Sequence, residues 1–259
     1  MNINLYLSKR QKEILDEVLR EGEVFVDDLA LKFDVSPQTI RMDLRELDKA
    51  EKLERTHGGA RAKNGKKNLA YEERKQIAAS EKISIGQAAA KLIPDNASLF
   101  INIGTTTEAV SDALQQHSGL LIITNNINVA SNLGLGDANE IAVAGGTVRA
   151  SDGGIIGEAT VDFINQFMVD FAIIGTSAIA EDGALLDFDY REVKVSQAIM
   201  KNARHVILVA DSTKLGRKAH ARIGHISQID TFVTDCIKSD ALKQICVDAD
   251  IDIIETKAD

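Results

Sequence analysis

The 259-residue chain contains no tryptophan, two prolines, two cysteines and five histidines. With only Cys236 and Cys246 it has no disulfide framework and no CxxC metal motif, and we expect two buried free thiols. No two histidines have a metal-ligand spacing, so we predict no metal site, and we predict no cofactor. No apolar run approaches the roughly 20 residues that cross a bilayer, and the N-terminal residues lack the apolar centre of a signal peptide. These absences favour a cytoplasmic globular protein with no membrane partner.

Positive charge is scarce overall but unevenly spread. The formal net charge is −9, yet residues 1–82 carry 17 Lys/Arg against 16 Asp/Glu, whereas residues 83–259 carry 13 against 23. The segment 35–67 has nine Lys/Arg and five Asp/Glu. Chance scatter of solvated charges is one explanation. Two units with different partners is the one we favour.

Helical patterns in the first 50 residues indicate a helix-turn-helix. A first helix starts near Ser8, and a second, short one is expected within "VFVDDLALKF", residues 24–33. Ser36 then offers an N-cap oxygen and Pro37 occupies the first helical position, so a third helix should run to about Ala50. Two short helices, a tight turn and a third helix opening in this way are typical of a recognition helix.

The third helix is predicted to read DNA. Its apolar positions recur at i, i+4 and i+7, which buries one face and leaves the other for polar side chains. A Gln and an Arg near the start of such a helix reach base edges, and a later Arg reaches phosphate. The segment "KLERTHGGARA" that follows is expected to be a basic hairpin, or wing, around His57-Gly58-Gly59, with Arg61 also near the DNA. The residues assigned to DNA binding are Ser36, Gln38, Thr39, Arg41, Arg45, Arg55 and His57.

The rest of the chain predicts a mostly parallel α/β domain. Six apolar runs of strand length, beginning near residues 98, 120, 140, 170, 205 and 231, each end in small polar residues, and helical patterns usually follow. Such strands form a parallel sheet covered on both faces. We therefore expect a winged helix-turn-helix domain in residues 1–62, a linker and lead-in helix in residues 63–80, and an effector domain in residues 81–259.

Ligands of parallel sheets bind beyond the carboxyl ends of the strands. There, "GTTTEAV" combines a tight turn with backbone N–H groups at a helix start, which suits a phosphate, although alone it is equally well a helix cap. Lysine and arginine in "DSTKLGR" would add positive charge, and carboxylates and amides would accept hydroxyl hydrogens. The residues assigned to effector binding are Gly104, Thr105, Thr106, Thr107, Asn125, Asn126, Asp152, Glu192, Asp211, Lys214 and Arg217. For Asn125 and Asp211, helix capping is the alternative, and for Lys214 and Arg217 it is surface charge.

The segments "SPQTIRMDLRELDKAEKLERTHGGA", "IGTTTEAV", "TNNINVA", "LLDFDYREV" and "DSTKLGR" resemble the DeoR family of sugar-operon repressors. The resemblance runs from about Ser8 to Asp235. It implies operator DNA as one partner and a phosphorylated effector as the other, either glycerol 3-phosphate or another sugar phosphate such as fructose 1-phosphate. It also implies an effector domain similar in fold to ribose-5-phosphate isomerase and CoA transferases.

An enzyme is the rival hypothesis, because the effector domain resembles that isomerase. The isomerase needs a Lys-Gly-Gly-Gly type loop shortly before its catalytic glutamate, and "GALLDFDYR" before Glu192 has none. We therefore expect binding without turnover and assign no catalytic residue. Few basic residues serve the DNA, so a homodimer or homotetramer on repeated half-sites is expected.

Overall fold

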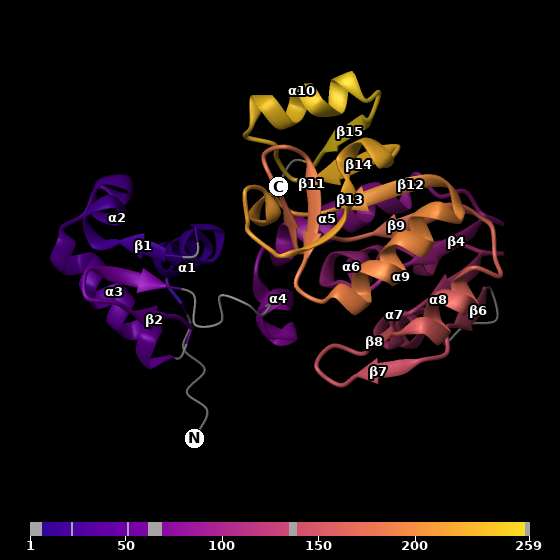
Figure 1. The fold of residues 1–259 in the computed structure, drawn as a ribbon, viewed down its shortest axis with the longest axis horizontal. Coiled ribbons are helices and arrows are strands. Elements are labelled where there is room, and N and C mark those ends of the chain that lie inside the picture. The colour runs from indigo at the N-terminus through magenta and orange to yellow at the C-terminus, as the bar shows by residue number, and fades with distance from the viewer. Residues whose placement is uncertain (1–6, 22, 51, 62–68, 135–138, 257–259) are drawn as a thin grey trace. The chain divides into compact units, whose positions relative to one another are not determined.

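The computed structural model describes residues 7–21, 23–50, 52–61, 69–134 and 139–256. Two compact units form, one of residues 1–68 and 216–218 and one of residues 69–215 and 219–259, and each is described by itself (Figure 1). The expected linker, residues 63–68, lies outside the described residues.

The smaller unit is a winged helix-turn-helix, as predicted. Its elements are α1 Lys9–Glu21, β1 Glu23–Phe25, α2 Val26–Phe33, α3 Pro37–Lys49, β2 Glu54–Arg55 and β3 Gly59–Arg61. The turn between α2 and α3 uses Asp34 in the left-handed conformation, with φ 50°. Ser36 caps α3, accepting the N–H of Thr39 at 3.2 Å. Ile40, Leu44 and Leu47 of α3 are fully or almost fully buried in the unit's core, which confirms the predicted apolar face.

The start of the second helix differs from the prediction. Val24 and Phe25 belong to β1, and the helix begins only at Val26. The reason is non-local, because β1 pairs antiparallel with β3 of the wing, giving a three-stranded sheet in the order β1-β3-β2. Gly59 permits this approach: a Cβ there would lie 1.8 Å from the carbonyl oxygen of Val24.

The larger unit is an α/β fold whose helices and strands mostly alternate. Its helices are α4 Tyr71–Gln76, α5 Ala79–Ala90, α6 Thr105–Ala113, α7 Ile127–Leu133, α8 Glu158–Ile164, α9 Tyr190–Lys201 and α10 Asp240–Asp248, with single turns η1 Leu114–Gln116, η2 Ser212–Lys214 and η3 Ile226–Gln228. The strands of its main sheet are β4 Ser98–Ile101, β5 Leu121–Thr124, β6 Glu140–Val143, β9 Val169–Ile174, β12 Ala203–Val209, β14 Thr231–Thr234 and β15 Asp252–Glu255. The first six in chain order are the predicted strands, and β15 was not predicted.

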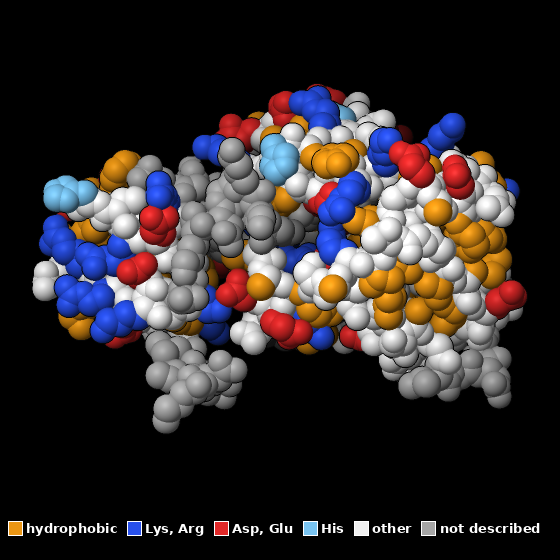
Figure 2. All heavy atoms as spheres, turned by 60° about the horizontal axis from the view of Figure 1, so that its bottom comes forward, with side chains coloured by type: hydrophobic (Ala, Val, Ile, Leu, Met, Phe, Trp, Pro, Cys, Tyr) orange, Lys and Arg blue, Asp and Glu red, His pale blue; other side chains and the backbone are white. Residues whose placement is uncertain are grey.

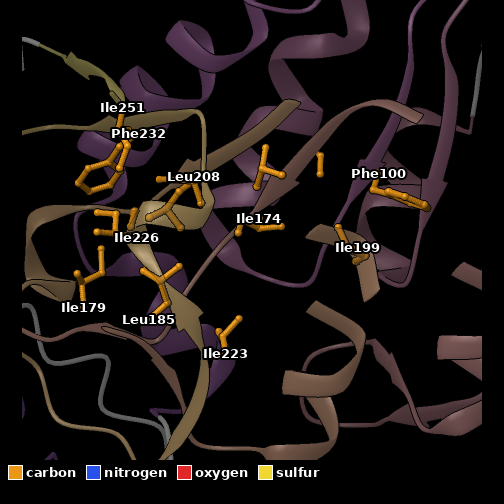
Figure 3. Close-up of a cluster of buried hydrophobic side chains, with 14 of the residues drawn as sticks. Phe100, Ile174, Ile179, Leu185, Ile199, Leu208, Ile223, Ile226, Phe232 and Ile251 are labelled. Carbon is orange, nitrogen blue, oxygen red and sulfur yellow. The ribbon is translucent and has the colours of Figure 1, made fainter. Parts of the chain in front are cut away.

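This sheet is parallel throughout, in the order β15-β14-β12-β9-β4-β5-β6. Buried side chains of α5, α6 and α7 form one apolar layer with it. Those of α8, α9 and α10 form another, and Figure 3 shows part of this second cluster, including Phe100, Leu208 and Phe232. Neighbouring residues of β4 belong to different layers, Leu99 to the first and Phe100 to the second. The prediction of a parallel sheet covered on both faces is confirmed.

Two small antiparallel sheets complete the larger unit. One is the hairpin of β7 Thr147–Arg149 and β8 Gly154–Ile156, and the other contains β10 Ala178–Ile179, β11 Ala184–Asp187 and β13 Ala221–His225. Cys246 is buried in α10, but Cys236 is only half-buried, because it follows β14 in a loop. The expectation of two buried thiols was wrong for Cys236. None of the helices in the described residues has the length and apolar character needed to span a bilayer.

Candidate functional sites

The exposed face of α3 carries the side chains predicted to read DNA. Gln38, Arg41 and Arg45 are exposed, and Thr39 is partly so. Among the described residues, none forms an ion pair with Arg41 or Arg45. Both guanidinium groups are therefore available to bases and phosphates. Ser36 is the exception among the predicted contacts, because its hydroxyl already serves the helix cap and lies 2.9 Å from that of Thr39.

Two of the acidic residues of α3 bind side chains of α1. Asp43 is buried and accepts from Arg10 of α1 at 2.6 Å. Glu46 accepts the side-chain amide of Gln11, also on α1, at 2.5 Å. The acidic groups thus fix α1 against α3, while Lys and Arg side chains gather on the outside of this unit (Figure 2).

The wing contributes less positive charge than the sequence suggests. Arg55 and His57 are exposed. Arg61, however, forms a bidentate ion pair with Glu54, with N–O distances of 2.8 and 2.9 Å. Glu54 is therefore paired with Arg61 across the hairpin.

In the larger unit, the loop after β4 has the form of an anion site, here called the phosphate cradle (Gly104–Thr107). Gly104 adopts φ 152°, a conformation that side chains rarely allow. α6 begins at once, so its first backbone N–H groups have no partner within the helix. The Thr107 hydroxyl fixes the loop by donating to the carbonyl oxygens of Asn102 at 2.7 Å and Gly104 at 2.8 Å. Thr105 and Thr106 have no side-chain hydrogen bond to any described residue, and they are the better ligand candidates.

Several strand ends converge on this cradle. A Cβ at Gly175, just after β9, would lie 3.5 Å from a Thr107 methyl and 4.0 Å from the Val209 carbonyl oxygen at the end of β12. Because β12, β9 and β4 are neighbours in the parallel sheet, their carboxyl ends lie together on this edge. Asp211, two residues beyond Val209, follows directly on this edge.

Asp211 has one carboxylate oxygen in use and one without a partner. Its Oδ1 accepts the N–H of Thr213 at 3.1 Å and caps η2, which confirms the capping alternative for that oxygen. Its Oδ2 is buried and has no hydrogen-bond partner among the residues that the structure describes. Burial opposes the charge of this group, but the neighbouring Lys214 and Lys82 hold the pKa of Asp211 below its usual value. The carboxylate is therefore charged, beside two buried ammonium groups.

Lys82 is a site residue that the sequence reasoning missed. It lies on α5 and is only 3% exposed. Its ammonium donates to the carbonyl oxygens of Arg74 and of Ile77, the latter at 2.6 Å. The signal was present, because Lys82, Ile85, Gly86 and Ala89 share one inward stripe in which a lysine stands out.

Asn125 and Asn126 follow the carboxyl end of β5 and form different hydrogen bonds. Asn125 is fully buried; its amide donates to the Ile155 carbonyl at 3.1 Å, and its Oδ1 has no partner. Asn126 caps α7, accepting the N–H of Asn128 at 2.9 Å, and donates to Glu108 at 3.0 Å. The helix cap is thus Asn126, so the capping alternative was wrong for Asn125, whose Oδ1 has no hydrogen bond to any described residue.

Asp152 and Glu192 meet through an arginine that the sequence reasoning did not select. Arg149 binds Asp152 with two nitrogens, at 2.7 and 2.8 Å, and also reaches Asp189 at 3.0 Å and Glu192 at 2.7 Å. Arg74 of α4 donates to Asp152 at 2.9 Å. We call these five residues the Asp152 cluster. Asp152 and Glu192 are thus brought together, each already paired with a cation.

The carboxyl groups of this cluster ionise differently. Burial opposes the charge of Asp152, but Arg149 and then Arg74 hold its pKa below the ordinary value. Burial, and next the charge of Asp187, raise the pKa of Glu192 to about 8 against the lowering effect of Arg149. Glu192 therefore gains a proton more readily than an ordinary glutamate.

The remaining predicted residues are Lys214 and Arg217. Lys214 ends η2 and is largely buried, so the surface-charge alternative was wrong for it. Arg217 is 5% exposed, so the surface-charge alternative was wrong for it as well, and its role as an effector contact stays a prediction. Within the described ranges, no group of three or more His, Cys, Asp or Glu is arranged to hold a metal ion.

Comparisons with known proteins match both units. Residues 10–66 match the DeoR-like helix-turn-helix domain and residues 77–236 match the DeoR C-terminal sensor domain. The two matches define a DNA-binding regulator with a separate sensor domain. The chain belongs to the DeoR family.

Relatives agree along nearly the whole chain. The glycerol-3-phosphate regulon repressor of Escherichia coli is 45% identical over 95% of this chain and 98% of its own length. The repressor of the same name from Haemophilus influenzae is 48% identical over 88% of this chain and 89% of its own length. Among solved structures, ribose 5-phosphate isomerase A of Methanocaldococcus jannaschii is 14% identical over 53% of this chain and 55% of its own, with a TM-score of 0.39.

Proposed function

We propose that this protein is a transcriptional repressor that binds operator DNA and is released from it by glycerol 3-phosphate. Arg41 and Arg45 of α3 are exposed and form no ion pair with a described residue. They support DNA reading, because arginine recognises both base edges and phosphates. The relatives named as glycerol-3-phosphate regulon repressors support the choice of effector. A repressor of this kind acts in the cytoplasm, where operator DNA lies.

The observation that carries the effector class is a pair of unused buried acceptors around the phosphate cradle. Asn125 Oδ1 and Asp211 Oδ2 have no hydrogen-bond partner among the described residues, and they follow strands on opposite sides of β4. A buried acceptor left without a donor costs free energy, so a ligand that supplies hydroxyl hydrogens there is favoured. The helix start of α6 and the buried Lys82 and Lys214 favour an anion between them. A small polyol with one phosphate provides both features.

Glu192 is a sensing residue in this proposal and not a catalytic base. The relatives are repressors, and the chain lacks the Lys-Gly-Gly-Gly type loop that would complete an isomerase site. Arg149 also binds the Glu192 carboxylate directly.

We further propose that the protein acts as a homodimer or homotetramer. A single α3 offers only two exposed arginines to DNA, and pairing two such helices on repeated half-sites multiplies their contribution. The mass of the DNA-free protein, measured by analytical ultracentrifugation, tests this. A monomer at the concentration that binds operator would contradict it.

Calorimetric titration tests the effector. Glycerol 3-phosphate is expected to bind with micromolar affinity, whereas glycerol is expected to give no heat, because it lacks the phosphate. Fructose 1-phosphate serves as the comparator of the alternative effector class. Heat with fructose 1-phosphate and none with glycerol 3-phosphate would replace the effector while keeping a sensor of phosphorylated metabolites.

A further inference from the structure

Helix α4 is the first described element after the wing. Arg61 ends β3 and Tyr71 begins α4, so nine residues separate them in the chain. The helix has six residues, no side-chain cap and no buried residue. A helix this short does not form on its own in water, because the free-energy cost of helix nucleation exceeds the stabilisation from the hydrogen bonds of one or two turns. Its position in the larger unit therefore depends on a few specific contacts.

The first contact is made by Tyr71. Its hydroxyl donates to Glu108 at 2.7 Å and accepts the side-chain amide of Asn128 at 3.0 Å. Asn128 donates in turn to Glu108 at 2.9 Å and to the Asp152 carbonyl oxygen at 3.0 Å. Tyr71 thus joins α4 to the first turn of α6, directly beyond the phosphate cradle.

The second contact is an ion pair, and the third consists of hydrogen bonds from an ammonium group. Arg74 binds the Asp152 carboxylate at 2.9 Å, with side chains only 13% and 4% exposed. The Lys82 ammonium donates to the Arg74 and Ile77 carbonyl oxygens at the end of α4. Each of the three contacts therefore reaches a residue in or next to the candidate effector site: Glu108, Asp152 or Lys82.

A phosphorylated effector would weaken all three contacts that hold α4. A phosphate at the start of α6 carries negative charge into the turn that holds Glu108, and it attracts the nearby ammonium of Lys82 away from the carbonyl oxygens of α4. An effector hydroxyl that donates to Asp152 competes with Arg74. A ligand shifts a conformational equilibrium only through such differential contacts, and here they fall on the groups that position α4.

We propose that α4 couples the effector site to the DNA-binding unit, with Tyr71 and Arg74 as its positioning residues. The inference rests on the proposed function. Tyr71 and Arg74 fix α4 to Glu108 and Asp152. Effector binding releases α4, and the change is passed along the chain to the wing that precedes it.

Thermodynamic reciprocity gives the test. If the effector favours released α4, a variant with α4 already released binds the effector as tightly or more tightly, and binds DNA more weakly. General structural damage would weaken both. The variants are Tyr71→Phe, which removes one hydroxyl, and Arg74→Gln. Gln76→Ala is the matched control, because Gln76 is exposed on the same helix and its side chain has no hydrogen bond to any described residue.

The full-length proteins are compared by fluorescence anisotropy with a selected operator duplex and by calorimetry with glycerol 3-phosphate. The effector-free Kd of Tyr71→Phe and Arg74→Gln for operator is expected to approach that of effector-saturated wild type, a change of about tenfold. Their Kd for glycerol 3-phosphate should be unchanged or lower, and Gln76→Ala should match wild type in both.

Two outcomes overturn the proposal. One is wild-type operator affinity and wild-type effector response in both variants. The other is weaker glycerol 3-phosphate binding, which would place α4 in the binding site or in the fold alone. Wild type that binds operator but no glycerol 3-phosphate would instead contradict the proposed effector, and the same comparison would then use the sugar phosphate that binds. Hydrogen exchange of residues 71–76 in wild type is a second readout: exchange should rise on effector binding, and no change contradicts release.

Discussion

Adding one methyl group to the wing is expected to unfold the DNA-binding unit while leaving the sensor unit intact. In Gly59→Ala the new Cβ would lie 1.8 Å from the Val24 carbonyl oxygen and 3.0 Å from Phe25 Cα. Both obstacles are backbone atoms of β1, so no side-chain rotation relieves the clash. Gly58→Ala is the matched control, because nothing lies within 4 Å of a Cβ at Gly58.

The magnitude follows from the sheet. A carbon and a carbonyl oxygen meet at about 3.3 Å, so β1 and β3 would have to separate by roughly 1.5 Å. The pairs Val24–Ala60 and Phe25–Gly59 would be lost, and with them the burial of Val24, which is 6% exposed. Lost burial and overpacking together cost about 3–5 kcal/mol, which equals the stability expected of a unit this small.

The assay is hydrogen exchange of α3 in the full-length protein, with operator affinity and glycerol 3-phosphate affinity measured in parallel. Gly59→Ala should lose protection in α3 and lose operator binding while retaining effector affinity. Gly58→Ala should keep wild-type protection, within about 0.5 kcal/mol. Wild-type protection and operator affinity in Gly59→Ala would refute the reasoning that the β1–β3 contact is indispensable.

Three further substitutions test the sites. Arg41→Ala should cost about 1–3 kcal/mol on a selected operator and little on random DNA, measured by anisotropy; an equal loss on both would make Arg41 a phosphate contact. Lys214→Ala should keep operator affinity, but its release from operator should need a much higher concentration of glycerol 3-phosphate. Lys201 is an exposed lysine at the end of α9, and Lys201→Ala should be released at the wild-type concentration. A normal response in Lys214→Ala would mean that the cradle is misplaced. Glu192→Gln tests the pH dependence of stability. Burial raises the folded-state pKa of Glu192 from 4.5 to about 8. The contribution of protonated Glu192 to stability is therefore complete below pH 4.5 and is lost as pH rises through 8. Relative to wild type, the urea-unfolding free energy of Glu192→Gln should therefore rise by about 1–3 kcal/mol between pH 5 and pH 8.5; a constant difference would contradict the raised pKa.

Local patterns predicted the elements that local interactions determine. Ser36 and Pro37 mark the start of α3, and Ile40, Leu44 and Leu47 mark its buried face, because capping and helical periodicity depend on neighbouring residues. The six apolar runs became six parallel strands for a similar reason, since burial on both faces demands continuous apolar sequence. The strand β1 was missed because its partner β3 lies more than 30 residues away in the chain.

The sequence predicted which strand ends form the candidate effector site, but not which of its side chains bind one another. Parallel strands bring their carboxyl ends to one edge, so the proximity of the cradle and Asp211 follows from topology. The partners of Asp152 do not follow from the topology of the sheet. Arg149 lies on a hairpin and Arg74 on the lead-in helix, and only the folded chain brings them together. Lys82 was detectable as a lysine on an apolar stripe, but its closeness to Asp211 was not.

Release of DNA by the effector is the most direct measurement. A fluorescent operator duplex, selected by the full-length protein from a randomised library, is bound at a concentration near its Kd, and glycerol 3-phosphate is added while anisotropy is recorded. Our account predicts that the DNA dissociates, with an operator Kd at least about fivefold weaker at saturation, and that glycerol has no effect. An operator that stays bound at concentrations of glycerol 3-phosphate that saturate the protein in calorimetry would contradict it.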